Sequence, residues 1–144
     1  MPVRRDDPYA NFNFVVEIDG IEPVGFSEVE LPEARVAEIA YREGADVASA
    51  ARVLPGRVAY GPLTLRRGVT GDTSLFEWWR AIRDGTLDQR AANVYLRDEG
   101  RNVVQTWRFR RTWPTTLSFS PLRGLGNEIA IETLVLSHDG FEIE

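Results

Sequence analysis

The feature that most constrains this fold is a pair of long alternating segments in the last third of the chain. Residues 107–113 are rich in aromatic and basic side chains, and residues 127–136, after a Gly-rich turn, are acidic and apolar. Because successive side chains of a strand point to opposite faces, both patterns predict β-strands. Long strands need a partner on each edge, from the same barrel or from a neighbouring subunit, if they are not to aggregate. The pattern therefore favours assembly over catalysis.

The composition indicates a folded domain with few chemical options. The 144 residues suffice for one domain with a substantial core, and 43% of them are hydrophobic. The chain has no cysteine, which excludes thiolate metal sites and cysteine catalysis, and its one histidine, His138, cannot build a multi-histidine site alone. We therefore expect no metal, no cofactor and no catalytic residue. The chain has no apolar run suited to a spanning helix or a signal peptide, so we expect no membrane insertion by the subunit.

Charge is distributed unevenly along the chain. Residues 1–50 hold eleven acidic residues and four arginines, a net charge of −7, whereas residues 51–144 hold eleven acids and thirteen arginines, a net charge of +2. Every basic residue is arginine; codon bias explains this most simply, and guanidinium contacts between subunits are the alternative. Net acidity argues against sequence-specific nucleic-acid binding. The local cluster of Arg108, Arg110 and Arg111 is interpreted as an interface or a solvated face.

Strands are expected along most of the chain. A hairpin is predicted around the Asp19-Gly20 turn, from alternating residues 12–18 and from residues 21–29. Further strands are expected at residues 35–41, 52–59, 63–67, 93–97 and 103–113, and the last at 127–138. A Pro/Ser-rich connection is expected from Pro114 to Pro121. The sequence alone therefore predicts an antiparallel barrel or two packed sheets, in one domain spanning residues 1–144.

One helix is predicted between two local signals. Ser74 and Glu77 match a capping box, with Asp72 and Thr73 as alternative caps, and Gly85 is placed where a helix C-terminus favours a positive φ. Four apolar residues between them share one face at helical spacing and are interpreted as core or interface packing: Leu75, Trp78, Trp79 and Ile82.

Motifs that would indicate an enzyme are weak. Gly124-Leu-Gly126 lacks the third glycine of a dinucleotide-binding loop and precedes a strand, so it is interpreted as a turn. His138 and Asp139 are adjacent on an expected strand and would point to opposite faces. Same-parity carboxylates such as Glu28 with Glu30 are more typical of a solvated or lumen-facing side than of a catalytic pair.

An ordered set of short motifs resembles the inner-tube proteins of contractile phage tails and extracellular contractile injection systems, which are related to the type VI secretion tube protein. The set opens with Asp7-Pro-Tyr-Ala-Asn-Phe-Asn-Phe14 and Gly25-Phe-Ser-Glu28, and it covers nearly the whole chain. It continues through Tyr41-Arg-Glu-Gly44, Leu54-Pro-Gly56, Leu63-Thr-Leu-Arg-Arg-Gly68, Leu75-Phe-Glu-Trp-Trp79, Trp113-Pro114 and Gly126-Asn-Glu-Ile-Ala-Ile-Glu-Thr-Leu134.

The resemblance implies an architecture and a mechanical role. It implies a mainly β protein, an antiparallel β-barrel of two packed sheets with one flanking helix, closed into homohexameric rings that stack into a hollow tube. It implies a surrounding sheath protein, baseplate or spike and terminator proteins, and a payload in the lumen. The subunit would be made and assembled in the bacterial cytoplasm without a signal peptide, then become part of a virion tail or a released injection particle. A phage tail and an injection particle are not separated by these motifs.

Two sets of site residues follow within this resemblance. Residues 42–52 form an expected loop longer than the usual connection of about 4–6 residues. In the tube proteins that the chain resembles, a loop at this place reaches the adjacent ring; an ordinary surface loop is the alternative. The stacking-loop candidates are Arg42, Glu43, Asp46, Val47, Ala48, Ser49, Ala50, Ala51 and Arg52. Strand alternation gives the lumen-facing candidates Glu17, Asp19, Glu128 and Glu132.

Two other classes of function remain open from the sequence. A monomeric barrel could bind a small ligand in an internal pocket lined by Trp78, Trp79, Trp107 and Trp113. An enzyme that uses His138 as a catalytic residue is the third hypothesis. A monomer with a ligand-dependent tryptophan signal would favour the ligand-binding barrel, and rings or fibres would favour the tube.

Overall fold

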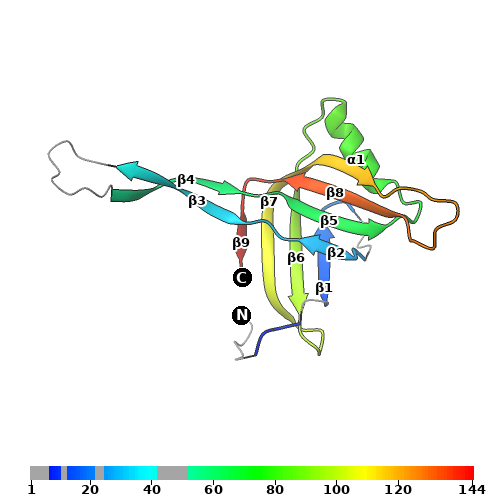
Figure 1. Cartoon of the computed structure of the whole chain (residues 1–144), viewed down its shortest axis with the longest axis horizontal. Helices are drawn as coiled ribbons and strands as arrows, with labels where there is room; N and C mark the ends of the chain where they lie inside the picture. Colours follow the sequence, from blue (N-terminus) through cyan, green and yellow to red (C-terminus); the bar gives the residue numbers. More distant parts are fainter. Residues whose placement is uncertain (1–6, 11–12, 22–24, 42–51) are drawn as a thin grey trace.

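The computed structural model describes residues 7–10, 13–21, 25–41 and 52–144, and it shows a β-rich body with one helix and one projecting ribbon (Figure 1). The elements in chain order are β1 (Phe14–Ile18), β2 (Glu28–Glu30), β3 (Ala34–Tyr41), β4 (Arg52–Tyr60), β5 (Leu63–Gly68), α1 (Ser74–Arg83), β6 (Arg90–Arg97), β7 (Val103–Phe119), β8 (Ile131–Ser137) and β9 (Phe141–Ile143). The expected mainly β, antiparallel fold with one helix is confirmed.

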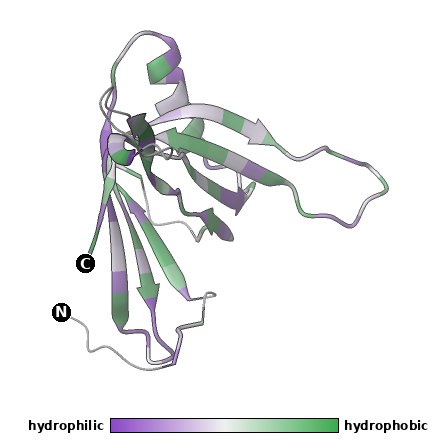
Figure 2. Ribbon diagram, turned by 60° about the vertical axis from the view of Figure 1, so that its left-hand side comes forward, coloured by the Kyte–Doolittle hydropathy of each residue, from purple (hydrophilic) through white to green (hydrophobic). Residues whose placement is uncertain are grey.

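Strand β7 organises the body because it belongs to both sheets. Its first part pairs with β6 and β9, and its second part, from Trp113 onward, pairs with β8. The strand order is β1-β6-β7-β8-β5-β2, and all pairs are antiparallel. The change of partner coincides with Arg111 at a φ of 51° and with a register shift between Pro114 and Thr116. In Figure 2 the two sheets run in different directions from this region.

The core fills the space between the two sheets. One sheet contributes Val16, Ile18, Ala92, Val94 and Phe109, and the other contributes Leu63, Leu65, Leu134 and Leu136, all of them buried. Along β8 these residues alternate with more exposed neighbours, as expected for a sheet with one covered face, whereas on β5 Thr64 is buried as well. The expected closed barrel is not observed. Among the described residues, β1 and β2 end the strand order without pairing to each other.

Strands β3 and β4 form a separate two-stranded sheet, here called the ribbon, which extends away from the body (Figure 1). Its register runs from the pair of Ala34 and Tyr60 to the pair of Tyr41 and Arg52. A bulge interrupts the ladder between Val36 and Glu38. A Cβ on Gly56 would lie 2.8 Å from Cγ1 of Ile39, so a larger residue here would displace the Ile39 side chain.

The helix begins and ends by partly different means from those predicted. Asp72, one of the alternative caps, accepts hydrogen bonds from the backbone N–H of Ser74 at 2.9 Å and from its hydroxyl at 3.1 Å. The helix begins at Ser74, so the cap position belongs to Thr73, the other alternative cap, and the Ser74/Glu77 capping box is wrong. Gly85 has a φ of 95°, as expected for the C-terminal glycine, and its N–H donates to the carbonyl of Ile82.

Several strand predictions were wrong because pairing is not local. Strand β1 pairs with β6 rather than with the residues after the Asp19-Gly20 turn, where only an isolated bridge joins Ile18 to Ile21. Strand β7 continues through Pro114 to Phe119 instead of ending in a connection. Strand β8 begins at Ile131 rather than at residue 127, and β9 was not predicted. Phe12, expected in the first strand, lies outside the described residues.

Candidate assembly interface

The ribbon is exposed on both of its faces. Every residue of β3 is exposed, and all of β4 except Gly56 and Tyr60 is exposed as well. The exposed side chains include large apolar ones, with Val58 at 62% and Leu54 at 46% of their full exposure. A two-stranded ribbon is marginally stable at best in water when nothing covers it. Apolar side chains at this density on an isolated ribbon indicate a surface that another protein covers.

The two faces of the ribbon differ in charge. Directly paired residues share a face, so Ile39 lies beside Leu54 on one face and Val36 beside Val58 on the other. The first, called the arginine face, also carries Arg35 and Arg57. A hollow beside these two arginines is lined as well by Val36, Ala37, Glu38 and Ala59. The second, called the valine face, carries Val36, Glu38, Val53 and Val58. The arginine face is basic and apolar, whereas the valine face is apolar with one carboxylate.

His138 holds the base of the ribbon against the body. Its Nδ1 accepts a hydrogen bond from the N–H of Gly140 at 3.0 Å, so the proton of the neutral ring is on Nε2, which donates to the carbonyl of Gly61 at 2.8 Å. The ring lies among those of Tyr60, Phe109 and Phe141. Both ring nitrogens are thus used in structural contacts between the β4–β5 turn and the β8–β9 turn.

A groove of about 560 Å³ lies where the strand order stays open. It is lined by Phe14, Val29, Leu31, Val94, Leu96 and Trp107, together with Ser27 and Glu28. At its rim Arg66 pairs with Glu28 and, at 3.2 Å, with Glu30. Among the four tryptophans only Trp107 lines this groove, and Trp78 is fully buried under the helix. The described structure therefore does not gather the tryptophans around one internal pocket.

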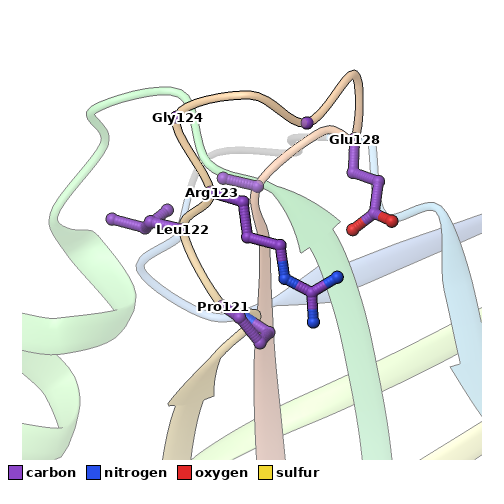
Figure 3. A pocket seen from close by; sticks show the side chains of 7 residues that line it. Pro121, Leu122, Arg123, Gly124 and Glu128 are labelled. Atoms are coloured by element: carbon purple, nitrogen blue, oxygen red, sulfur yellow. The ribbon is translucent and has the colours of Figure 1, made fainter.

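The loop between β7 and β8 presents a second apolar surface (Figure 3). Leu122 is 85% exposed and Leu125 is fully exposed, and Ile129 is exposed as well. The base of the loop is held because Ser120 donates its N–H to the carbonyl of Ile131 and accepts the N–H of Ile131 on its hydroxyl at 2.9 Å. Gly126 donates its N–H to the carbonyl of Arg123, which confirms the predicted turn.

Three of the four predicted lumen-facing carboxylates are exposed. Glu17, Asp19 and Glu128 are exposed, and Glu17 accepts hydrogen bonds from Asn93 at 3.2 Å and from the hydroxyl of Tyr95 at 3.4 Å. Arg108 pairs in register with Asn93, which pairs with Glu17, so this outer face of the sheet mixes acidic and basic side chains.

Glu132 is the exception, since only 6% of its surface is exposed. It forms an ion pair with Arg67, which is 1% exposed and pairs with it in register across β5 and β8. A carboxylate enclosed within its own protomer cannot line a channel, so Glu132 is removed from the lumen candidates. Arg67 also reaches Asp72 at 3.4 Å and lies over the ring of Phe26. This ion-pair cluster joins the start of α1 to the sheet beneath it.

The predicted helix face is only half buried. Leu75 and Trp78 are buried, whereas Trp79 and Ile82 are partly exposed. Trp78 donates its indole N–H to the carbonyl of Asp88 at 2.7 Å, and the guanidinium of Arg90 lies 4.9 Å from its ring centre. Trp79 donates to the carbonyl of Thr115 in β7 at a long 3.4 Å. The predicted face of α1 therefore packs on β7 at one side, and Trp79 remains partly exposed at the surface.

The expected stacking loop falls almost entirely outside the described residues. Arg42, Glu43, Asp46, Val47, Ala48, Ser49, Ala50 and Ala51 belong to the segment 42–51, which joins β3 to β4. Arg52, the last residue of the set, is the first residue of β4 and pairs with Tyr41. Its assignment to a loop was therefore wrong.

Two carboxyl groups with a lowered pKa, those of Asp72 and Asp88, form hydrogen bonds that stabilise the fold. The pKa of Asp72 is lowered chiefly by the hydrogen bond from the backbone of Ser74, and the pKa of Asp88 is lowered by its hydrogen bond with Arg90. Within the described part of the chain, no group of three or more potential metal ligands gathers in one place. None of the helices in the same ranges has the length and apolar character needed to cross a bilayer.

A family model identifies the class of protein to which the chain belongs. The family model of the T4-like virus tail tube protein gp19 matches residues 10–142. The chain belongs to this tail tube protein family. A comparison with curated proteins gives no match.

Solved structures agree with this family. A chain of the PVC sheath-tube complex of an extracellular contractile injection system in the extended state is 25% identical, with a TM-score of 0.84 over 95% of this chain and 91% of that one. A chain of the anti-feeding prophage baseplate is 21% identical, with a TM-score of 0.85 over 97% of both chains. Hcp1 from Flavobacterium johnsoniae is 15% identical, with a TM-score of 0.59 over 92% of this chain and 94% of that one, a likeness of fold.

Proposed function

We propose that this protein is the inner-tube subunit of a contractile injection system, assembled as homohexameric rings that stack into a hollow conduit. The single observation that carries the proposal is the exposed ribbon, whose two apolar faces are not covered by the described part of the protomer. Membership of the tail tube family and similarity to a chain of a sheath-tube complex support the same role. The role is structural, and the subunit performs no chemistry.

The open strand order supports ring formation by a physical argument. Strands β1 and β2 end the sheet, and edge strands of this kind invite pairing with another chain. A contact between two different surfaces of identical subunits closes into a ring when its rotation closes. The ribbon and the open groove are two such different surfaces on one chain.

Partners outside the ring are proposed from the complexes in which similar chains occur. A sheath around the tube and a baseplate at its end are proposed, because similar chains occur in a sheath-tube complex and in a baseplate. A spike and a terminator complete the proposed particle. Assembly is proposed to occur in the bacterial cytoplasm, before the subunit becomes part of a tail or a released particle.

The lumen and the stacking contact are assigned as proposals. Glu17, Asp19 and Glu128 are proposed to contribute to the channel wall, where negative charge would keep an anionic payload from adhering. The segment 42–51 is proposed to reach the adjacent ring, since it joins Tyr41 to Arg52, the last pair of the ribbon.

Sedimentation and negative-stain microscopy of the purified protein test the role. Rings, and tubes at high concentration, are expected without any added cofactor. A strict monomer across a wide concentration range would count against the tube. A ligand-dependent tryptophan signal from such a monomer would support the small-ligand barrel instead.

A further inference from the structure

We propose that His138 is a pH-sensitive clasp, which holds the ribbon in one direction relative to the body at neutral pH and releases it when the imidazole ring is protonated. The release itself concerns a single protomer. Its consequence for assembly, weaker rings at mildly acidic pH, rests on the proposed function. A ribbon that changes its direction presents its faces less often in the orientation that another copy can bind.

The ribbon has few attachments to the body, from which it projects (Figure 1). Among the described strands, β3 and β4 pair only with each other. The chain leaves β4 at Tyr60, and β5 begins at Leu63, so this connection consists of Gly61 and Pro62. Strand β3 has eight residues and spans about 26 Å, so a small rotation at its base moves its far end most. The direction of the ribbon therefore depends on the contacts at its base.

His138 supplies two hydrogen bonds at this base. Gly61 donates its N–H to the carbonyl of Glu33 at 3.0 Å, and its own carbonyl accepts the Nε2 hydrogen of His138 at 2.8 Å. Gly140 donates its N–H to Nδ1 of His138 at 3.0 Å. The ring of Tyr60 packs on Gly140, where a Cβ would lie 2.8 Å from Cε2 of the tyrosine. One imidazole ring thus links the end of the ribbon to the β8–β9 turn.

The two hydrogen bonds require the neutral ring with its proton on Nε2. A protonated imidazole carries a hydrogen on both nitrogens and accepts no hydrogen bond. Its Nδ1–H would face the N–H of Gly140, so that two donors would meet at a place where the nitrogens now lie 3.0 Å apart. Gly140 is buried, and a buried N–H without an acceptor destabilises the closed arrangement. Protonation therefore favours a form in which the β4–β5 connection and the β8–β9 turn separate.

The charged groups around the ring do not offset its protonation. The titratable and charged side chains on the segments packed around it are those of Glu33, Tyr60, Arg110, Arg111 and Asp139. Arg110 adds a like charge, since a Cβ on Gly140 would lie 3.0 Å from its guanidinium. Asp139 pairs with Arg111 at 3.4 Å, and Glu33 contacts Arg35 at 3.9 Å. Within the ranges that the structure describes, no carboxylate forms an ion pair with the imidazole ring.

His138 is the only side chain of this protein that ordinarily titrates near neutral pH. The chain has one histidine and no cysteine. Three carboxyl groups have a lowered pKa, which moves them further from this range: Asp72, Asp84 and Asp88. Histidine ordinarily gains its second proton below a pH of about 6.5. The clasp is therefore present above that pH and is lost as the pH falls below it.

Spin labels measure the direction of the ribbon, because the chain offers no native cysteine to compete with engineered ones. Val53→Cys in β4 and Ser118→Cys in β7 replace two exposed residues. Pulsed electron paramagnetic resonance gives the distance between the labels in dilute, ring-free protein at pH 7.5 and 5.5. A narrow distribution should broaden at the lower pH. The ratio of closed to open ribbon should fall by about tenfold, because only the open form accepts the proton.

Two variants of His138 serve as matched controls. His138→Gln keeps a donor near the position of Nε2, and His138→Asn keeps an acceptor near that of Nδ1, but neither side chain titrates. Each labelled variant should give the same distribution at both pH values, and either one suffices if the other does not fold. An unchanged distribution in the protein that retains His138 would overturn the clasp. Equal broadening in the variants would overturn it too, since another group would then be responsible.

Sedimentation at the same two pH values separates this inference from the proposed function. The concentration for half-maximal ring formation should rise by up to about tenfold at pH 5.5 in the unaltered protein, and it should not change in His138→Gln. Rings whose ribbon does not respond to pH would remove the clasp and leave the proposed function standing. A monomer at every concentration whose ribbon still opens at pH 5.5 would leave the clasp and remove the tube.

Discussion

At the residue scale, Trp78 fixes the helix to the body. Its side chain is 1% exposed, and its indole N–H has a backbone acceptor. Trp78→Ala should lower the free energy of unfolding by about 3–5 kcal/mol, the range for a buried aromatic truncated in a core. Trp79→Ala is the matched control, and it should cost clearly less because Trp79 is only partly buried. Chemical denaturation of both variants in ring-free conditions measures the difference, and equal losses would show that the assignment is wrong.

The carboxyl group of Asp72 should make stability depend on pH. Its pKa is lowered because Ser74 donates to it, with a further contribution from the charge of Arg67. A folded pKa below the unfolded one means that this contribution is fully present above the unfolded pKa and is lost as the pH falls through the folded value. Asp72→Asn should therefore flatten the acid side of the stability curve. Denaturation across pH 2–7 would test this, with Ser74→Ala expected to give part of the effect.

Glu132 shows how far the burial of a single residue can be predicted from the sequence. Its pattern was read as solvated because carboxylates are usually exposed, yet Glu132 has the parity of Leu134 and Leu136, which are buried. Arg67 likewise has the parity of Leu63 and Leu65. Two charged residues at apolar parity on neighbouring strands signal a buried pair, but the signal needs the register of β5 with β8. That register depends on which distant strands pair, whereas the positive φ of Gly85 could be predicted from the local sequence alone.

At the element scale, the ribbon is separable from the body. No core residue comes from β3 or β4, so its removal should leave folding intact. Replacing residues 36–58 with Asn-Gly between the paired Arg35 and Ala59 should give a soluble monomer with an unchanged unfolding temperature. Scanning calorimetry measures the unfolding temperature, and sedimentation measures the oligomeric state. A large loss of stability would show that the ribbon packs on its own body, and retained rings would remove it from the interface.

The sequence predicted where strands occur more readily than it predicted which strands pair with each other. The alternation at residues 35–41 and 103–113 predicted strands that are present as β3 and part of β7. Pro114 was expected to end its strand because proline cannot donate to a ladder. It instead lies where β7 changes partner and the register shifts. A local pattern does not reveal such a change, just as a tight turn after β1 did not reveal that β1 pairs with the distant β6.

At the scale of the whole molecule, charge polarity connects the protomer to its assembly. In the proposed ring or stack, the acidic first third of one copy would contact the more basic remainder of the next. Contacts of this kind are screened by salt, with a Debye length of about 10 Å at 0.1 M. The length of tubes should therefore fall as ionic strength rises, although apolar contacts would keep single rings together.

The segment that joins β3 to β4 gives the last prediction, about stacking. Its residues Ala48, Ser49, Ala50 and Ala51 are small and would let the backbone lie close to a neighbouring ring. Replacing residues 47–51 with a Gly-Ser linker of equal length keeps the ribbon and the groove unchanged, so single rings should still form. Long tubes should be lost, because the linker would lack the side chains proposed to contact the next ring. Negative-stain microscopy measures tube length, with a Leu125→Ser variant as a control in a different loop. Tubes of normal length from the linker variant would return the segment to the status of an ordinary surface loop, while the ring contact would stand unaffected.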